Sequence, residues 1–230
     1  MKKFSSILVL SICLAATAPA AVVTFTGGTV YQNGGSTGTT DTIKLFAGVD
    51  YYVESGFKFQ YLGGTGGAVG AYYWGEANDV IHGHWGWGDM NTIEITKVGG
   101  GTFDFNYFVL TSNTLQPGGP ATGAEIVYAQ AWLNGSQVGS DVKLPSEDWG
   151  LGTTTDVFFD STFDVVDKVV ITSPMNQTLA GTGYGACFGM DAFYIDQAAP
   201  VSPSVPEPSA LSLLALGLGG LVSVRGFRRS

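Results

Sequence analysis

One short stretch of this chain holds most of the side chains that could bind a metal ion. His82-Gly83-His84 is the only histidine pair, and residues at i and i+2 of an extended chain point to the same side. With Asp79 or Asp89 as a further ligand, the pair is a candidate site for zinc or copper. The other interpretation is two solvent-accessible histidines in a loop, since two histidines without a definite third ligand are a weak signal.

The same stretch has the densest group of aromatic residues in the chain: Tyr72, Tyr73, Trp74, Trp85 and Trp87. Flat rings pack well against the apolar faces of sugar rings, while neighbouring carboxylates and amides accept hydrogen bonds from sugar hydroxyls. The segment 72–87 is therefore a candidate glycan-binding site. Alternatively, these rings hold a glycine-rich loop against the edge of the fold.

Catalysis has little support in the sequence. No Gly-x-Ser-x-Gly, His-Glu-x-x-His or Walker motif occurs. Glu147 and Asp148 form a carboxylate pair in a predicted loop, but glycoside hydrolysis depends on a separation in space that a sequence does not show. We therefore expect a protein that is not an enzyme.

The elements that would position these residues are predicted to be strands. Short runs rich in Val, Ile, Thr, Phe and Tyr alternate with clusters of glycine and asparagine, and no long stretch of the body has helical spacing of apolar residues. Asn134-Gly135 predicts a tight hairpin turn. Residues 33–38 are expected to form a loop and residues 63–70 a turn. The predicted strands are 22–26, 42–46, 51–61, 91–97, 102–111, 124–133, 136–144, 156–159, 168–173 and 189–195.

Alternation within these strands also predicts which side chains are buried. Phe57, Phe59 and Tyr61 share one face, which we expect to be core. In 102–111, the residues Phe103, Phe105, Tyr107 and Val109 alternate with Phe108 and polar residues. Cys187 is the only cysteine after Cys13, and its small apolar neighbours predict a buried thiol and no disulfide within the body.

Charge restricts the partners of the body. Residues 21–199 contain five lysines and eighteen acidic residues, so their net charge is 5 − 18 = −13. Such an excess repels phosphate backbones and anionic headgroups, which argues against nucleic acid as a partner. Divalent cations and neutral glycans are compatible with this charge. The alternative is that the acidity only keeps a secreted protein soluble.

The N-terminus predicts export. Lys2 and Lys3 precede the apolar run 4–14, and Ala18-Pro19-Ala20 is a cleavage site of small residues, so residues 1–20 have the order of a secretory signal peptide. We expect this helix to engage the Sec translocon and signal peptidase. A lipoprotein box at 10–13 is the alternative, but Ile12 occupies the place of a small residue.

The C-terminus combines three features in order. Val205-Pro206-Glu207-Pro208 precedes the apolar run 209–224, and Arg225, Arg228 and Arg229 follow. The sixteen apolar residues span about 24 Å as a helix, less than the bilayer core of about 30 Å, so the segment would be a weak membrane anchor. The linker 198–205 before it is rich in proline, which favours an extended chain.

This tail, residues 206–230 with Val205, resembles the PEP-CTERM sorting signal of Gram-negative bacteria. The resemblance implies recognition by an exosortase, which is a membrane transpeptidase, and cleavage near Pro206 to Pro208. It also implies a temporary stay in the inner membrane through a C-terminal transmembrane helix, before delivery to the cell surface or extracellular matrix. Exopolysaccharide is a candidate partner there. A membrane anchor that is never cut is the other interpretation.

The body, residues 21–197, resembles the β-sandwich domains that often precede this tail. The resemblance depends on Glu54-Ser55-Gly56-Phe57, the middle strand that begins Gly101-Thr102-Phe103-Asp104, the Asn134-Gly135 hairpin, the strand 163–171 and the closing segment 189–195. It implies an antiparallel, jelly-roll-like β-sandwich. Domains of this kind often bind calcium through an early and a late acidic residue, which correspond here to Glu54 and Asp191. The alternative role of Asp191 is to cap a turn through backbone hydrogen bonds.

Overall fold

The computed structural model describes residues 20–41, 43–63, 67–71, 78–81, 91–115, 118–149, 154–174 and 187–197, and for residues 71 and 78–81 only the backbone. The chain divides into two units, residues 1–198 and residues 199–230, and every described residue belongs to the first. Residues 1–19 of the predicted signal peptide 1–20, the linker 198–205 and the tail therefore lie outside the described residues. Among the described residues, no helix is long and apolar enough to cross a membrane.

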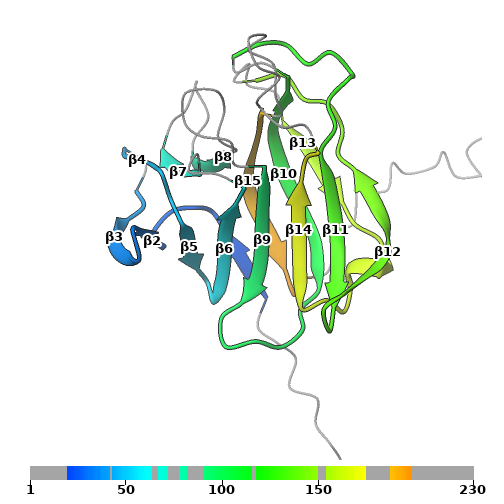
Figure 1. The fold of residues 1–230 in the computed structure, drawn as a ribbon, viewed down its shortest axis with the longest axis horizontal. Coiled ribbons are helices and arrows are strands. Elements are labelled where there is room, and N and C mark those ends of the chain that lie inside the picture. Colours follow the sequence, from blue (N-terminus) through cyan, green and yellow to red (C-terminus); the bar gives the residue numbers. More distant parts are fainter. Residues whose placement is uncertain are drawn as a thin grey trace, which may run out of the picture. The chain divides into compact units, whose positions relative to one another are not determined.

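The described strands form two sheets, and every strand pair is antiparallel. One sheet has eight strands in the order β12-β11-β14-β9-β6-β5-β2-β3, which Figure 1 shows side by side. Its strands are β2 (Thr29–Gln32), β3 (Gly35–Thr39), β5 (Tyr51–Glu54), β6 (Phe57–Leu62), β9 (Thr92–Lys97), β11 (Tyr128–Leu133), β12 (Ser136–Lys143) and β14 (Lys168–Thr172).

The second sheet has seven strands, in the order β13-β10-β15-β8-β7-β4, with β1 also paired to β15. In Figure 1, β10 and β15 lie in the layer behind the eight-stranded sheet. The strands are β1 (Ala21–Val23), β4 (Leu45–Ala47), β7 (Ala68–Ala71), β8 (Asn78–Ile81), β10 (Phe105–Thr114), β13 (Thr155–Phe158) and β15 (Cys187–Ile195). A short 3₁₀ helix, η1 (Ser161–Phe163), precedes β14.

Aromatic side chains join the two sheets across one core. The ring of Phe59 on β6 lies 5.3 Å from that of Phe193 on β15, and Phe25 contacts both rings at 5.3 and 5.6 Å. All three side chains are completely buried. Burying one such ring contributes about 1.5–3 kcal/mol, so this contact between layers is a substantial part of the fold's stability. The all-β, sandwich-like prediction is confirmed, while its jelly-roll connectivity stays a prediction.

Several local predictions are also confirmed. Phe57, Phe59 and Tyr61 are all buried, as is the thiol of Cys187. Asn134 and Gly135 connect β11 to β12 with φ angles of +51° and +77°, as the predicted hairpin turn requires.

Two predicted segments were wrong because each of them contains a two-residue turn. The strand expected over 51–61 is a hairpin, in which Ser55 and Gly56 adopt φ angles of +51° and +80° between β5 and β6. The loop expected over 33–38 is likewise a turn at Asn33-Gly34 followed by β3. The predicted turn 63–70 also contains the first residues of β7. In both hairpins the two turn residues adopt positive φ, and the second of them is glycine, which adopts this conformation without a steric cost.

A third prediction was wrong in β10. Phe108 was expected to face away from Phe105, yet both side chains are buried. The pairing of β10 with β15 shifts register between Phe105 and Tyr107 and again between Phe108 and Leu110. Such bulges change which face a side chain occupies, so simple alternation does not hold along this strand.

Candidate functional site

The outward face of the eight-stranded sheet presents an ordered row of polar and aromatic side chains. Because directly paired residues share a face, the pairings Lys58–Thr96, Thr96–Lys168 and Lys168–Trp132 place these four residues in one row across β6, β9, β14 and β11. The row next to it contains Tyr31, Tyr51, Gln60, Glu94, Val170 and Gln130. These two rows are therefore assembled from six strands, β2, β5, β6, β9, β14 and β11.

A groove lies at the β2–β5 side of this face. Tyr31 and Tyr51 stack with ring centroids 4.2 Å apart and planes 13° apart, and Lys58 Nζ lies 4.7 Å from the Tyr51 centroid. The groove has a volume of about 420 Å³. We call it the Tyr51 groove, and it is lined by Tyr31, Tyr51, Val53, Lys58, Thr96, Lys97, Val98 and Gly99.

The two groove lysines differ in their partners. Lys97 Nζ forms an ion pair with Asp196 at 3.2 Å, which offsets much of its charge. Lys58 has no carboxylate partner among the described residues, and its ammonium group is held instead against the face of Tyr51. A cation over an aromatic face gains only about 0.5–1 kcal/mol at an exposed site. Because this interaction is weak and leaves the charge of Lys58 in place, Lys58 remains available to an anion.

On the opposite side of the face, Lys168 also lies over an aromatic ring, but it has a carboxylate partner as well. Lys168 Nζ lies 4.8 Å from the ring of Trp132 and forms an ion pair with Glu94 at 3.0 Å. Trp132 in turn donates a hydrogen bond to Gln130 at 3.3 Å, and Gln130 donates to Asp141 at 3.1 Å. Amide, indole and ammonium donors therefore lie beside one another here, and Trp132 on β11 lies four strands from Tyr51 on β5.

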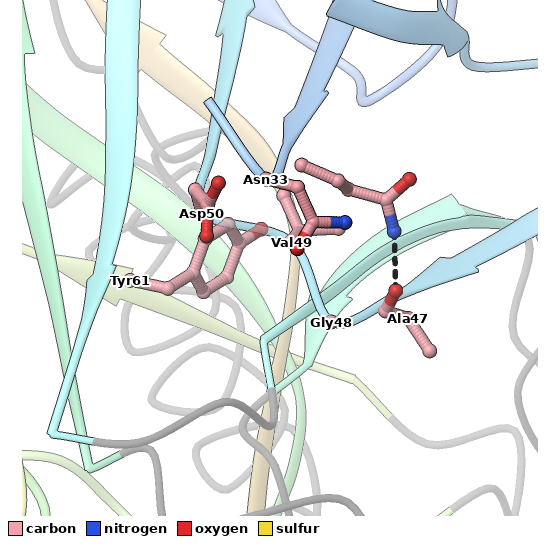
Figure 2. Close-up of a pocket in the computed structure, with 7 residues that line it drawn as sticks. Asn33, Ala47, Gly48, Val49, Asp50 and Tyr61 are labelled. Atoms are coloured by element: carbon pink, nitrogen blue, oxygen red, sulfur yellow. Dashed lines mark hydrogen bonds between the residues drawn. The ribbon is translucent and has the colours of Figure 1, made fainter. Parts of the chain in front are cut away.

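A second hollow lies where the β2–β3 turn meets the segment after β4. Its volume is about 320 Å³, and Asn33, Gly48, Val49, Asp50 and Tyr61 are among its lining residues (Figure 2). Asp50 accepts a hydrogen bond from Gly34 N at 3.1 Å, and the side-chain amide of Gln32 donates one to the Ala47 carbonyl. With a single carboxylate, already bound to the backbone, this hollow has no pair of groups for acid–base chemistry.

The predicted calcium residues lie in different sheets. Glu54 ends β5, and its carboxylate accepts hydrogen bonds from Thr24 N at 2.9 Å and from the Tyr52 hydroxyl at 2.6 Å. Asp191 lies on β15, where β10 and β15 shift register. Glu54 thus has a clear structural role, which is to bind the segment after β1 to β5. The calcium site stays a prediction.

The remaining predicted site residues fall outside the described residues. Tyr72, Tyr73 and Trp74 are in the connection between β7 and β8, while Trp85, Trp87, His82 and His84 follow β8. The structure thus places them by their flanking strands only: β8 belongs to the seven-stranded sheet and β9 to the eight-stranded sheet. Within the part of the chain that the structure describes, no three His, Cys, Asp or Glu side chains come together in a way that could hold a metal ion.

The acidic residues that the sequence singled out as a carboxylate pair have structural partners. Asp148 accepts a hydrogen bond from Ala121 N at 2.7 Å, and Glu147 accepts one from the Thr155 hydroxyl. The backbones of Glu147 and Asn113 form an antiparallel bridge, with N···O distances of 2.8 and 3.2 Å. The two acids therefore connect loops to strands.

Glu125 is a buried acid that the sequence analysis missed. Its carboxylate accepts hydrogen bonds from Ser146 at 2.6 Å and from the backbone and hydroxyl of Thr122 at 2.7 and 2.9 Å. Burial raises the pKa of Glu125, but these hydrogen bonds outweigh burial and hold the pKa below its ordinary value. The Thr-x-x-Glu spacing of Thr122 and Glu125 is too common to have identified it.

The Tyr51 groove was missed for a different reason. Tyr31, Tyr51 and Lys58 are unremarkable in sequence, and their proximity depends on the pairing of β2 with β5 and of β5 with β6. The one available signal was that tyrosine and lysine occupy the outward-facing positions of these strands, where smaller polar residues are typical of a solvated face.

Comparison with known proteins concerns the tail alone. No curated protein and no solved structure matches the chain. Residues 204–229 match the PEP-CTERM protein-sorting motif, which covers the Pro-Glu-Pro segment, the apolar run and the arginines. This motif indicates a protein that an exosortase sorts to the cell surface or the extracellular space of a Gram-negative bacterium.

Proposed function

We propose that this chain is an exported structural protein of the cell surface or extracellular matrix and not an enzyme. The observation that carries the proposal is the match of residues 204–229 to the PEP-CTERM protein-sorting motif. The proposed route begins with the signal peptide, the Sec translocon and signal peptidase. The apolar run then holds the chain briefly in the inner membrane, and exosortase cleaves near Pro206 to Pro208.

The body supports this role in two ways. Its described part is a two-layer antiparallel fold with one aromatic core, for which we propose jelly-roll-like connectivity. The described acids Glu54, Glu125, Glu147 and Asp148 each have hydrogen-bond partners from the backbone or from hydroxyl groups. Side chains with such fixed partners stabilise loops, which suits a structural protein.

The test is mass spectrometry of the mature protein from the producing cell. We expect a C-terminus near Pro206 to Pro208 and no peptide that spans Leu214 to Arg225. A Glu207→Ala variant should instead remain in the inner membrane with its tail intact. Pro203→Ala, a change in the linker, is the matched control and should be processed like the wild type. Intact tail peptides in the surface form of the wild-type protein would contradict the proposal.

The alternative function is a secreted carbohydrate-binding module that uses the aromatic segment 72–87. Its support is the set of five aromatic residues described above. A glycan array with the purified protein separates the two functions. Binding that is lost in Trp74→Ala and Trp85→Ala variants would favour the module, whereas the structural role requires no glycan contact through this segment.

A further inference from the structure

The charges on the outward face of the eight-stranded sheet differ from those of the rest of the body. The strand pairings place five charged side chains on this face: Lys58, Lys143, Lys168, Glu94 and Asp141. Lys97, which also lines the groove, forms an ion pair with Asp196, and this pair adds no net charge. Three positive and two negative charges leave a net charge of +1, in a body whose net charge is −13. An anion is therefore repelled by most of the body and least repelled here.

Both carboxylates on this face are already engaged. Glu94 pairs with Lys168 at 3.0 Å, and Asp141 accepts hydrogen bonds from Gln137 at 2.6 Å and Gln130 at 3.1 Å. Lys58, by contrast, has no carboxylate partner among the described residues, and its ammonium group lies 4.7 Å from the centroid of Tyr51, which stacks on Tyr31. A carboxylate that binds Lys58 therefore meets a cation whose charge is not already offset by an ion pair to a described residue.

The other groups of this face suit a sugar polymer. Tyr31, Tyr51 and Trp132 supply apolar ring surface, while the Thr96 hydroxyl and the Gln60 amide supply hydrogen-bonding groups for hydroxyls. Tyr51 and Trp132 lie four strands apart, which corresponds to about 19 Å, long enough for several sugar rings. Lys58 and Lys168 lie two strands apart, about 10 Å, so charges on a ligand would need to be well spaced.

Nucleic acid fits this face less well. Duplex DNA carries one negative charge per about 1.7 Å, and its binding depends on many cations acting together. A local net charge of +1 within a body of −13 does not supply them. A polymer that carries one carboxylate per sugar has a far lower charge density and more hydroxyl and C–H surface.

We infer that the outward face of the eight-stranded sheet binds an acidic polysaccharide of the polyuronate class, with Lys58 in the Tyr51 groove as the carboxylate-binding residue. This site is separate from the segment 72–87. It also does not rest on the proposed sorting, because binding by purified protein involves neither the signal peptide nor exosortase.

The test measures the affinity of the full-length chain in mild detergent for polygalacturonate by isothermal titration calorimetry, with dextran as the uncharged polymer. We expect Lys58→Gln to weaken the binding of polygalacturonate about tenfold, and Lys58→Arg to restore it, since one charge-assisted hydrogen bond accounts for a change of that size. Binding should weaken as salt is added, because the groove is exposed to solvent. Dextran should bind much more weakly than polygalacturonate.

Lys44→Gln is the matched control. Lys44 Nζ also lies over an aromatic ring, 4.3 Å from the centroid of Phe46, but it precedes β4 of the other sheet. This variant should bind polygalacturonate within about twofold of the wild type, since it keeps every group of the groove. Tyr51→Ala should weaken binding while keeping a cooperative melting transition.

Two results would overturn the inference. One is equal affinity of the wild type and Lys58→Gln for polygalacturonate. The other is binding of dextran, duplex DNA or phosphatidylglycerol vesicles as tightly as polygalacturonate, because the face would then select neither a sugar nor a carboxylate.

Discussion

The Tyr52 hydroxyl donates a hydrogen bond to the Glu54 carboxylate across 2.6 Å, in a part of the core where Tyr52 has no exposed surface. The same hydroxyl accepts a hydrogen bond from Gly28 N at 3.1 Å and lies 2.8 Å from Thr40 Oγ1. Burial and the neighbouring carboxylate raise the pKa of Tyr52 above its ordinary value, so it stays a donor. One phenol thus connects β5 to the segment before β2 and to the end of β3.

Removing this hydroxyl should destabilise the fold. Tyr52→Phe leaves the Gly28 N–H and one Glu54 oxygen without this partner, and we expect a loss of about 1–3 kcal/mol in the free energy of unfolding. Urea denaturation followed by tryptophan fluorescence measures it. Tyr51→Phe removes an outward-facing hydroxyl from the neighbouring residue and should change stability by less than about 0.5 kcal/mol. Equal effects of the two variants would refute the role of this network.

Gly28 should not tolerate a side chain. An added Cβ would lie 2.2 Å from Tyr52 Oη and 2.7 Å from the Val53 carbonyl oxygen, so strand β5 or the Tyr52 ring would have to move. We expect Gly28→Ala to destabilise by about 1–3 kcal/mol, the usual range for overpacking. Gly35→Ala, in β3, is the control, because an added Cβ there meets nothing within 4 Å. A neutral Gly28→Ala variant in thermal denaturation would show that the hydroxyl network adapts.

Glu125 should contribute to the loss of stability in acid. Its pKa is lower in the folded chain than its ordinary value of 4.5, so its contribution is present above pH 4.5 and is lost as the pH falls through the folded-state pKa. Glu125→Gln should be less stable than the wild type at neutral pH, and its stability should fall less steeply below pH 4.5. Urea titrations at a series of pH values measure this. Parallel curves for the two proteins would assign the acid sensitivity to other groups.

Cys187 should be unreactive while the protein is folded. The side chain is 1% exposed, and burial raises the pKa of its thiol to about 12. A thiolate is the reactive form, so we expect very slow labelling by a thiol reagent near pH 8. The measurement uses a Cys13→Ser background, and labelling in urea at the same pH is the control. Fast labelling of the native protein would indicate that this end of β15 opens.

Some of this architecture could be predicted because it depends on neighbours in sequence. Phe57, Phe59 and Tyr61 alternate with polar residues, and in a strand such alternation is enough to assign a buried face. Asn134-Gly135 likewise predicted its turn, since few dipeptides tolerate two successive positive φ angles. Ser55-Gly56 has the same backbone conformation but was missed, because a serine at the first position is a much weaker turn signal.

By itself, then, the sequence determined the strand composition, the alternating core positions and the sorting motif, all of which are encoded in consecutive residues. Only the tertiary structure decided that Tyr31, Tyr51 and Lys58 form one groove and that three lysines share one face with two carboxylates. It also decided that bulges bring both Phe105 and Phe108 into the core. The reason is that register between distant strands depends on how the two sheets fit together around the whole core, which no local pattern specifies.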